Sequence, residues 1–220
     1  MMIKTIRVML LPNNKQKTKL FQYSNTARFA YNWALGREKE NYKNGGKFIS
    51  DGDLRKEFTQ LKKTDKYSWL NEISNNVTKQ AIKDACNAYK RFFNGYSKFP
   101  KFKSRKSSAP SFYQDNVKIQ FSDTHVKVEG FATSKKKNKQ KLNWIRLAEH
   151  GRIPTDCKYC NPRIKYDGLN WYITVGIEYE DSTTLPSNEG IGIDLVISKI
   201  HGVLNISRGP IFVIYRSIFG

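Results

Sequence analysis

The run IKTIRVMLLP occupies residues 3–12 and decides how the rest of the chain must be arranged. Its β-branched and aliphatic side chains predict a strand over residues 3–11, and Pro12 ends that strand because proline has no backbone N–H to donate. The next strand-like segments appear only after residue 117. A strand needs neighbours, so we expect the first strand to pair with this distant part of the chain.

Three helices are predicted between the first strand and those partners. The first covers residues 14–42, ends at Asn44-Gly45-Gly46, and lines one face with Leu20, Tyr23, Ala27, Ala30 and Ala34. The second covers residues 51–62, with Leu54, Phe58 and Leu61 at helical spacing. The third covers residues 74–93 with Ser74 as N-cap, and its predicted buried stripe is Val77, Ala81, Ala85, Tyr89 and Phe93.

Short strands dominate the second half of the chain. They are predicted at residues 117–121, 126–128, 144–147, 163–166 and 171–179. A hairpin turn is expected at residues 166–170, a linker at 181–188, and a new strand from Gly190. The order predicts an α+β fold, in which a small β-barrel carries a helical bundle inserted after its first strand.

The net charge of +20, from 39 Lys and Arg against 19 Asp and Glu, indicates an anionic partner, most simply nucleic acid. No run is apolar and long enough to span a bilayer, and the N-terminus lacks the pattern of a signal peptide, so we expect no membrane partner. Three cysteines form no disulfide framework, and a cytoplasmic location is expected. Cys157 and Cys160 have the spacing of half a zinc site, but the other half is missing, so ordinary cysteines are expected.

A basic tract with interleaved aromatic residues, KFPKFKSRK, fills residues 98–106. Cations contact phosphates, while aromatic rings stack on bases or anchor a loop to the core. The alternative is a solvated loop anchored by Phe99 and Phe102. The predicted nucleic-acid contacts in this tract are Lys98, Lys101, Lys103, Arg105 and Lys106. A lysine-rich run at residues 135–141 fits a solvated loop equally well.

The polar face of the third helix is a second candidate contact surface. Lys79 and Lys83 can meet phosphates, and the amides of Asn76 and Gln80 suit the hydrogen-bonding edge of adenine. The alternative is a face that only meets solvent.

One carboxylate, Asp194, lies in the apolar run GIGIDL at residues 190–195. A buried acid in such a run is costly unless it is paired or binds a cation. The functional interpretation is a metal ligand of an RNase H-like nuclease, and the alternative is an aspartate that caps a turn. A two-metal site needs several carboxylates, and no Asp or Glu follows Asp194.

Four stretches together resemble the transposon-encoded RNA-guided endonucleases of the OrfB/TnpB type, relatives of the Cas12 effectors. They are residues 28–35, residues 81–93 with 98–105, residues 111–113 with 116–119, and Gly192-Ile193-Asp194-Leu195.

This resemblance implies a wedge-type β-barrel, an inserted helix-turn-helix-like recognition bundle, and the start of a RuvC nuclease domain. The implied domains are the first barrel strand at 1–12, the recognition bundle at 13–97, the remaining strands at 98–181, and a linker with an incomplete RuvC segment at 182–220. The implied partners are a guide RNA and double-stranded DNA. Asn76, Lys79 and Gln80 then read a short target-adjacent motif, and Asp194 is the first catalytic, Mg²⁺-binding aspartate.

The chain also departs from the family pattern. Val196 stands where the family has glycine, and residues 207–220 resemble nothing in it. We therefore expect a chain truncated after its first RuvC motif, without tightly bound Mg²⁺ and unable to cleave DNA alone. The alternatives are a second polypeptide that supplies the missing acids, an inactive DNA-binding remnant or repressor, and an unstable product of a decayed gene.

Overall fold

A computed structural model of the protein describes residues 2–132 and 141–179. The chain divides into two units, Met1–Ser182 and Thr183–Gly220. The predicted linker, the strand from Gly190 and the RuvC-like segment lie outside the described residues, and so does the lysine run up to residue 140. The four domain ranges expected from the sequence stay predictions.

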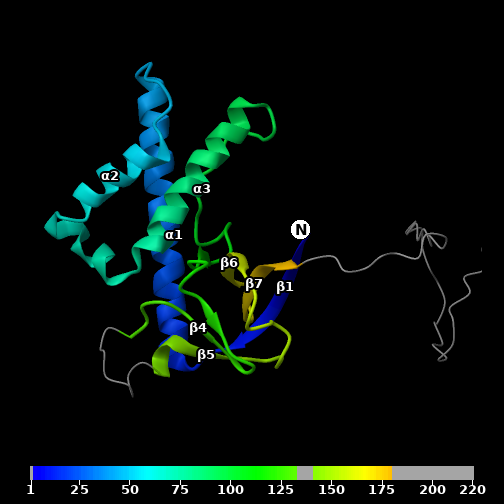
Figure 1. The fold of residues 1–220 in the computed structure, drawn as a ribbon. Helices are drawn as coiled ribbons and strands as arrows, with labels where there is room; N and C mark the ends of the chain where they lie inside the picture. Colours follow the sequence, from blue (N-terminus) through cyan, green and yellow to red (C-terminus); the bar gives the residue numbers. More distant parts are fainter. Residues whose placement is uncertain (1, 133–140, 180–220) are drawn as a thin grey trace, which may run out of the picture. The chain divides into compact units, whose positions relative to one another are not determined.

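Two long helices, α1 (Asn14–Lys43) and α3 (Asn75–Phe93), pack against each other and form the centre of the helical layer (Figure 1). The helix α2 (Asp51–Leu61) and the 3₁₀ segment η1 (Asp65–Glu72) connect them. Helix α1 begins with a capping box, in which Asn13 Oδ1 accepts from Gln16 N–H and Gln16 Oε1 accepts from Asn13 N–H. All three predicted helices are confirmed.

The predicted buried faces are confirmed with one exception. The five apolar positions proposed for α1 are buried, as are the first four of α3. Phe93, predicted to close the α3 stripe, is 50% exposed. It is the last residue of α3, and its ring lies 5.9 Å from that of Tyr42, which is itself exposed at the end of α1. The stripe therefore ends at Tyr89, the last of its side chains that is buried.

Seven antiparallel strands form one sheet. They are β1 (Met2–Leu11), β2 (Ser111–Tyr113), β3 (Gln120–Phe121), β4 (His125–Lys127), β5 (Trp144–Leu147), β6 (Tyr159–Tyr166) and β7 (Trp171–Tyr179), in the spatial order β2-β6-β7-β1-β5-β4-β3. Strand β1 pairs with β7 from Met2 opposite Tyr179 to Leu10 opposite Trp171. The predicted long-range pairing of the first strand is confirmed.

The strand predicted over residues 117–121 is wrong in its first half. Asp115 Oδ1 accepts hydrogen bonds from the backbone N–H groups of Val117 and Lys118, which holds the chain in a turn. The Val117 side chain is 88% exposed, and pairing begins only at Gln120. The chain instead forms β2 earlier, against β6.

The seven strands form an open sheet with edges β2 and β3, so the predicted closed barrel is not confirmed for the described residues. The edge strands follow each other in sequence, and Gln114 between them contacts both sides of the opening. Its backbone N–H donates to the Pro162 carbonyl at 2.9 Å, and its buried Oε1 accepts from Glu129 N–H at 3.0 Å. A side-chain amide thus replaces a strand ladder at this point.

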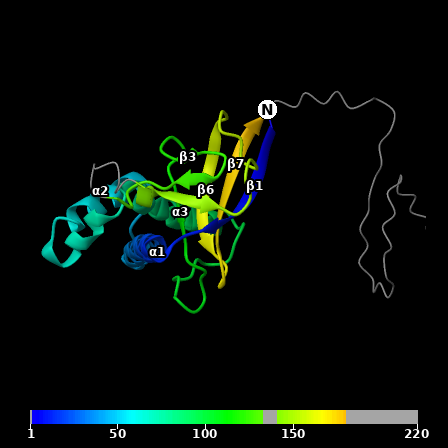
Figure 2. The same cartoon turned by 90° about the horizontal axis from the view of Figure 1, so that it is seen from below.

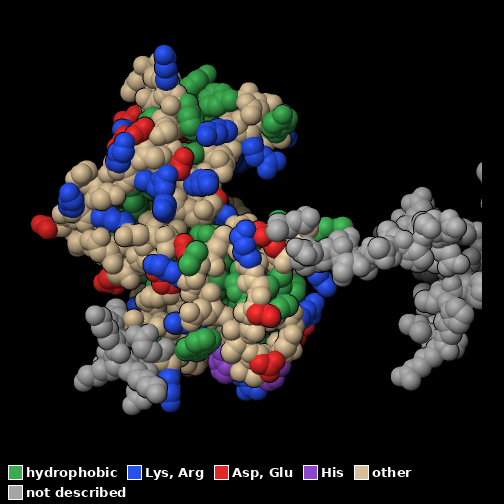
Figure 3. Space-filling model, in the orientation of Figure 1, with side chains coloured by type: hydrophobic (Ala, Val, Ile, Leu, Met, Phe, Trp, Pro, Cys, Tyr) green, Lys and Arg blue, Asp and Glu red, His purple; other side chains and the backbone are tan. Residues whose placement is uncertain are grey.

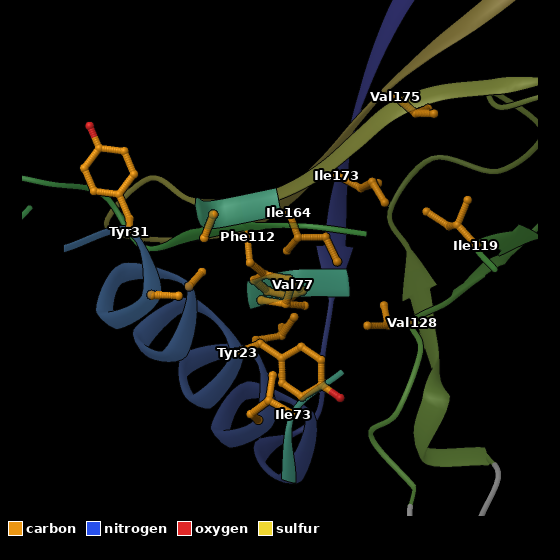
Figure 4. Close-up of a cluster of buried hydrophobic side chains, with 14 of the residues drawn as sticks. Tyr23, Tyr31, Ile73, Val77, Phe112, Ile119, Val128, Ile164, Ile173 and Val175 are labelled. Carbon is orange, nitrogen blue, oxygen red and sulfur yellow. The ribbon is translucent and has the colours of Figure 1, made fainter. Parts of the chain in front are cut away.

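The helices pack on one side of the curved sheet (Figure 2). In the core, Ile164 and Ile173 of the sheet approach Tyr23 and Val77 of the helices (Figure 4). Tyr23 is fully buried and its hydroxyl donates to the Glu129 carbonyl at 3.0 Å. One core therefore fixes α1 and α3 relative to the sheet. Among the described residues, none of the helices is both long and apolar enough to cross a bilayer.

Candidate nucleic-acid interface

Helix α3 presents two of the predicted cations to solvent. Lys79 and Lys83 are exposed one turn apart, because the stripe from Val77 to Tyr89 occupies the opposite face. Ser74 Oγ accepts from Asn76 N–H and caps the helix. Lys and Arg side chains gather over the helical layer in the upper half of Figure 3.

The two amides predicted to read bases already have partners. Asn76 Nδ2 donates to Glu129 Oε2 at 3.3 Å, and Gln80 Nε2 donates to Asp84 Oδ1 at 2.9 Å. Both side chains are half-buried. Each NH₂ group keeps a second N–H donor, but its present hydrogen bond fixes the orientation of the amide, so a base contact that needs another orientation must first break that bond.

The basic tract at residues 98–106 lies against α1 and α3. The Phe99 ring is 5.5 Å from the ring of Tyr89 and 5.1 Å from that of Phe92, both on α3. Asn32 of α1 holds the tract at Lys103, whose N–H donates to Asn32 Oδ1 and whose carbonyl accepts from Asn32 Nδ2, both at 2.8 Å. Four predicted contacts of this tract, Lys98, Lys101, Arg105 and Lys106, are exposed.

Lys103 differs from the other cations of the tract because it is half-buried. Its Nζ lies 3.8 Å from the centre of the Tyr31 ring, a cation–π contact. Burial lowers the pKa of Lys103; Asp84 opposes that shift, and Arg163 adds to it. The structure therefore brings Lys103 to the α1–α3 side of the tract and leaves the other four cations on its outer side.

Arg163 and Lys62 have structural settings that sequence reasoning missed. Arg163 of β6 pairs with Asp84 of α3 and lines the same small pocket as Lys103. Lys62 at the end of α2 is buried. One signal was available in the sequence, because Lys62 follows the buried residues Leu54 and Phe58 at four-residue steps and so belongs to the apolar face.

The predicted metal ligand Asp194 lies outside the described residues. Within residues 2–132 and 141–179, no group of three or more His, Cys, Asp and Glu side chains is placed to hold a metal ion. Cys160 Sγ donates to Glu178 Oε1 at 3.1 Å, and Glu178 also pairs with Lys158.

Comparison with known proteins agrees with the resemblance seen in the sequence. Residues 1–47 match the OrfB IS605 helix-turn-helix domain family. In this structure the matched residues contain β1 and α1.

Two curated relatives match most of the chain. The "Putative RNA-guided DNA endonuclease InsQ" of Escherichia coli strain K12 is 26% identical over 211 residues, which are 96% of this chain and 48% of that protein. A "Putative RNA-guided DNA endonuclease" of Streptomyces pristinaespiralis is 23% identical over 189 residues, which are 86% of this chain and 45% of that protein. The chain therefore spans about half the length of the curated relatives it matches.

Proposed function

We propose that this chain, a relative of the OrfB/TnpB-type RNA-guided DNA endonucleases, binds a guide RNA and double-stranded DNA through its helical layer. The proposed surface consists of the predicted contact residues of α3 and of the basic tract that are exposed, which are Lys79, Lys83, Lys98, Lys101, Arg105 and Lys106.

The observation that supports this most is the attachment of the basic tract to the helices. Asn32 fixes the backbone of the tract at Lys103, and Phe99 anchors it on α3. A tract fixed in this way presents its cations with less loss of conformational entropy on binding than a free loop. It also lies against α3, the helix that carries the exposed Lys79 and Lys83.

Salt dependence of binding tests the proposal. The affinity for duplex DNA and for structured RNA is measured over a salt series, and log K should fall steeply with log salt because phosphate contacts release counterions. Replacing the four exposed cations of the tract with glutamine should weaken binding and reduce the slope by roughly 0.9 per lost contact to duplex DNA. The charge-matched control replaces four exposed lysines elsewhere: Lys4, Lys15, Lys17 and Lys165.

The two variants carry the same net charge, so only the position of the lost cations differs. Equal slopes for the tract variant and the control would contradict the proposed surface. Salt-independent binding by the unmodified chain would contradict the proposed function itself.

For cleavage we propose dependence on carboxylates from outside these 220 residues, since two-metal hydrolysis needs several acids at one site. The chain alone with Mg²⁺ should bind DNA without cutting it. Cleavage by the purified 220-residue chain would refute this part.

A further inference from the structure

An open pocket of about 650 Å³ lies between α2, η1 and α3, and it is unusually basic. Five cationic side chains line it: Arg55, Lys56, Lys62, Lys63 and Lys79. Two of them are neutralised within α2, because Arg55 pairs with Asp51 at 2.7 Å and Lys56 with Asp53 at 2.9 Å. Within the described part of the chain, the three remaining lysines have no carboxylate within ion-pair distance.

Lys62 carries most of the argument because it is only 7% exposed. Its Nζ donates to Asn75 Oδ1 at 2.6 Å and lies 5.5 Å from the centre of the Phe58 ring. Both of these partners also line the pocket, so the ammonium lies in the pocket wall. Burial lowers the pKa of Lys62. A buried cation is costly unless it is paired, and Asn75 satisfies only one of its three N–H donors.

The position of Lys62 at the C-cap of α2 offsets part of this cost, because the carbonyl end of a helix favours a positive charge. The helix end supplies only partial charge. A full negative charge from a bound ligand would neutralise the ammonium and accept its free N–H groups.

The rest of the pocket indicates what kind of anion fits. Its volume exceeds that of a phosphate group, and Phe58 and Ile82 contribute an apolar surface against which a planar base can pack. Asn71 also lines the pocket and offers an amide. A duplex presents its phosphates on a convex surface and keeps its bases stacked inside. Only a nucleotide outside a helical stack can place its base and its phosphate in one concave pocket.

We propose that this pocket binds one unstacked nucleotide of a nucleic-acid strand, with its phosphate on Lys62 and its base against Phe58 and Ile82. The inference rests on the proposed function and extends it to a second site. Lys79 connects the two, because it lines the pocket and also belongs to the exposed face of α3.

Three probes test the proposal: a short labelled single-stranded oligonucleotide, a blunt duplex of the same sequence, and adenosine monophosphate. The variants are Lys62→Met, Lys63→Met and the control Lys17→Met, which removes the same charge from an exposed position of α1. Lys62→Met should weaken single-strand binding about tenfold, as the loss of a charge-assisted contact does, and weaken duplex binding no more than the control does.

Lys63→Met keeps the test decisive if Lys62→Met fails to fold, because Lys63 lines the pocket, is exposed and lies outside the surface proposed for the duplex. It should weaken single-strand binding about threefold more than Lys17→Met.

If both pocket variants bound the single strand as tightly as Lys17→Met does, the inference would be overturned. The proposed nucleic-acid binding would then still stand. If a pocket variant lost the same affinity for the single strand as for the duplex, the claim that the pocket binds an unstacked nucleotide would be overturned. If only adenosine monophosphate binding depended on Lys62, the ligand would be a free nucleotide and the strand assignment would be wrong. If the unmodified chain bound neither oligonucleotide, the proposed function itself would fail.

Discussion

Arg163 of β6 holds Asp84 of α3 in a two-point contact, with Nη1 donating to Oδ2 at 2.8 Å and Nη2 donating to Oδ1 at 3.0 Å. The side chains are 35% and 24% exposed, so water screens the pair less than it screens an ordinary surface ion pair. The contact spans 79 residues and joins the helical layer to the sheet. It also fixes the carboxylate that accepts from Gln80.

A double-mutant cycle on Asp84→Ala and Arg163→Ala should give a coupling energy of about 1 kcal/mol, measured by urea unfolding. The exposed pair Asp53 and Lys56, which lie three residues apart on α2, is the matched control and should couple more weakly because solvent screens it. The cycle is needed because Asp84→Ala also releases Gln80. Equal coupling in the two pairs would show that the bidentate contact adds no stability.

Gln114 provides a test of how the sheet is held together. Gln114→Leu keeps the side-chain volume roughly constant but leaves the Glu129 N–H without its acceptor, so it should lower the free energy of unfolding by about 2 kcal/mol. The control is Gln120→Leu, since Gln120 is exposed and should change stability by about 0.5 kcal/mol or less. A Gln114→Leu variant as stable as the control would mean that the opening is held by other contacts.

The parts of the fold that could be predicted from the sequence are those with local signals. Helical periodicity and the Ser74 cap predict the helices, and the alternation of apolar side chains from Trp171 to Ile177 predicts β7. The strand β2 was not predicted because three residues carry too little pattern and its pairing partner β6 is distant. Val117 was misassigned because β-branching favours a strand, whereas the Asp115 side chain stabilises a turn.

The candidate site was predictable as a set of cations but not as a geometry. The net charge and the residues of the tract at 98–106 indicated a basic segment with interleaved aromatic side chains. Four cations of that tract are exposed, as a contact surface requires. The burial of Lys103 depends on Tyr31 and Asn32, some 70 residues earlier, and the pocket at Lys62 depends on how α2 packs on α3. Apart from the four-residue spacing that places Lys62 on the apolar face of α2, such tertiary contacts leave no local sequence pattern.

Lys62 should make stability depend on pH in a defined direction. Its pKa is lower in the folded than in the unfolded chain, so between those two values the unfolded state binds more protons and stability rises with pH. Lys62→Met removes the buried charge and should stabilise the free protein by about 1 kcal/mol near neutral pH. This advantage should shrink as the pH rises towards the ordinary lysine pKa.

The measurement is the difference in unfolding free energy between Lys62→Met and the unmodified chain over a pH series. Taking the difference cancels the titration of tyrosines common to both proteins. A difference independent of pH would show that Lys62 titrates alike in both states. A destabilised Lys62→Met at neutral pH would show that its hydrogen bond to Asn75 outweighs the cost of burying its charge.

The two hydrogen bonds between Asn32 and Lys103 can be separated by substitution. Asn32→Ala removes both, whereas Asn32→Asp keeps an acceptor for the Lys103 N–H and loses the donor to the Lys103 carbonyl. Amide hydrogen exchange at Lys103 should be faster in Asn32→Ala than in Asn32→Asp. Because the freed tract must be ordered again on binding, Asn32→Ala should also bind nucleic acid about threefold more weakly.

The control for this pair is Gln22→Ala, which truncates an exposed amide elsewhere on α1 and should change neither exchange nor affinity. The combination of readouts separates positioning from contact. Faster exchange together with weaker binding means that Asn32 acts by holding the tract in place. Weaker binding with unchanged exchange at Lys103 would mean that Asn32 itself contacts the nucleic acid, and faster exchange with unchanged affinity would mean that the fixed position of the tract does not matter for binding.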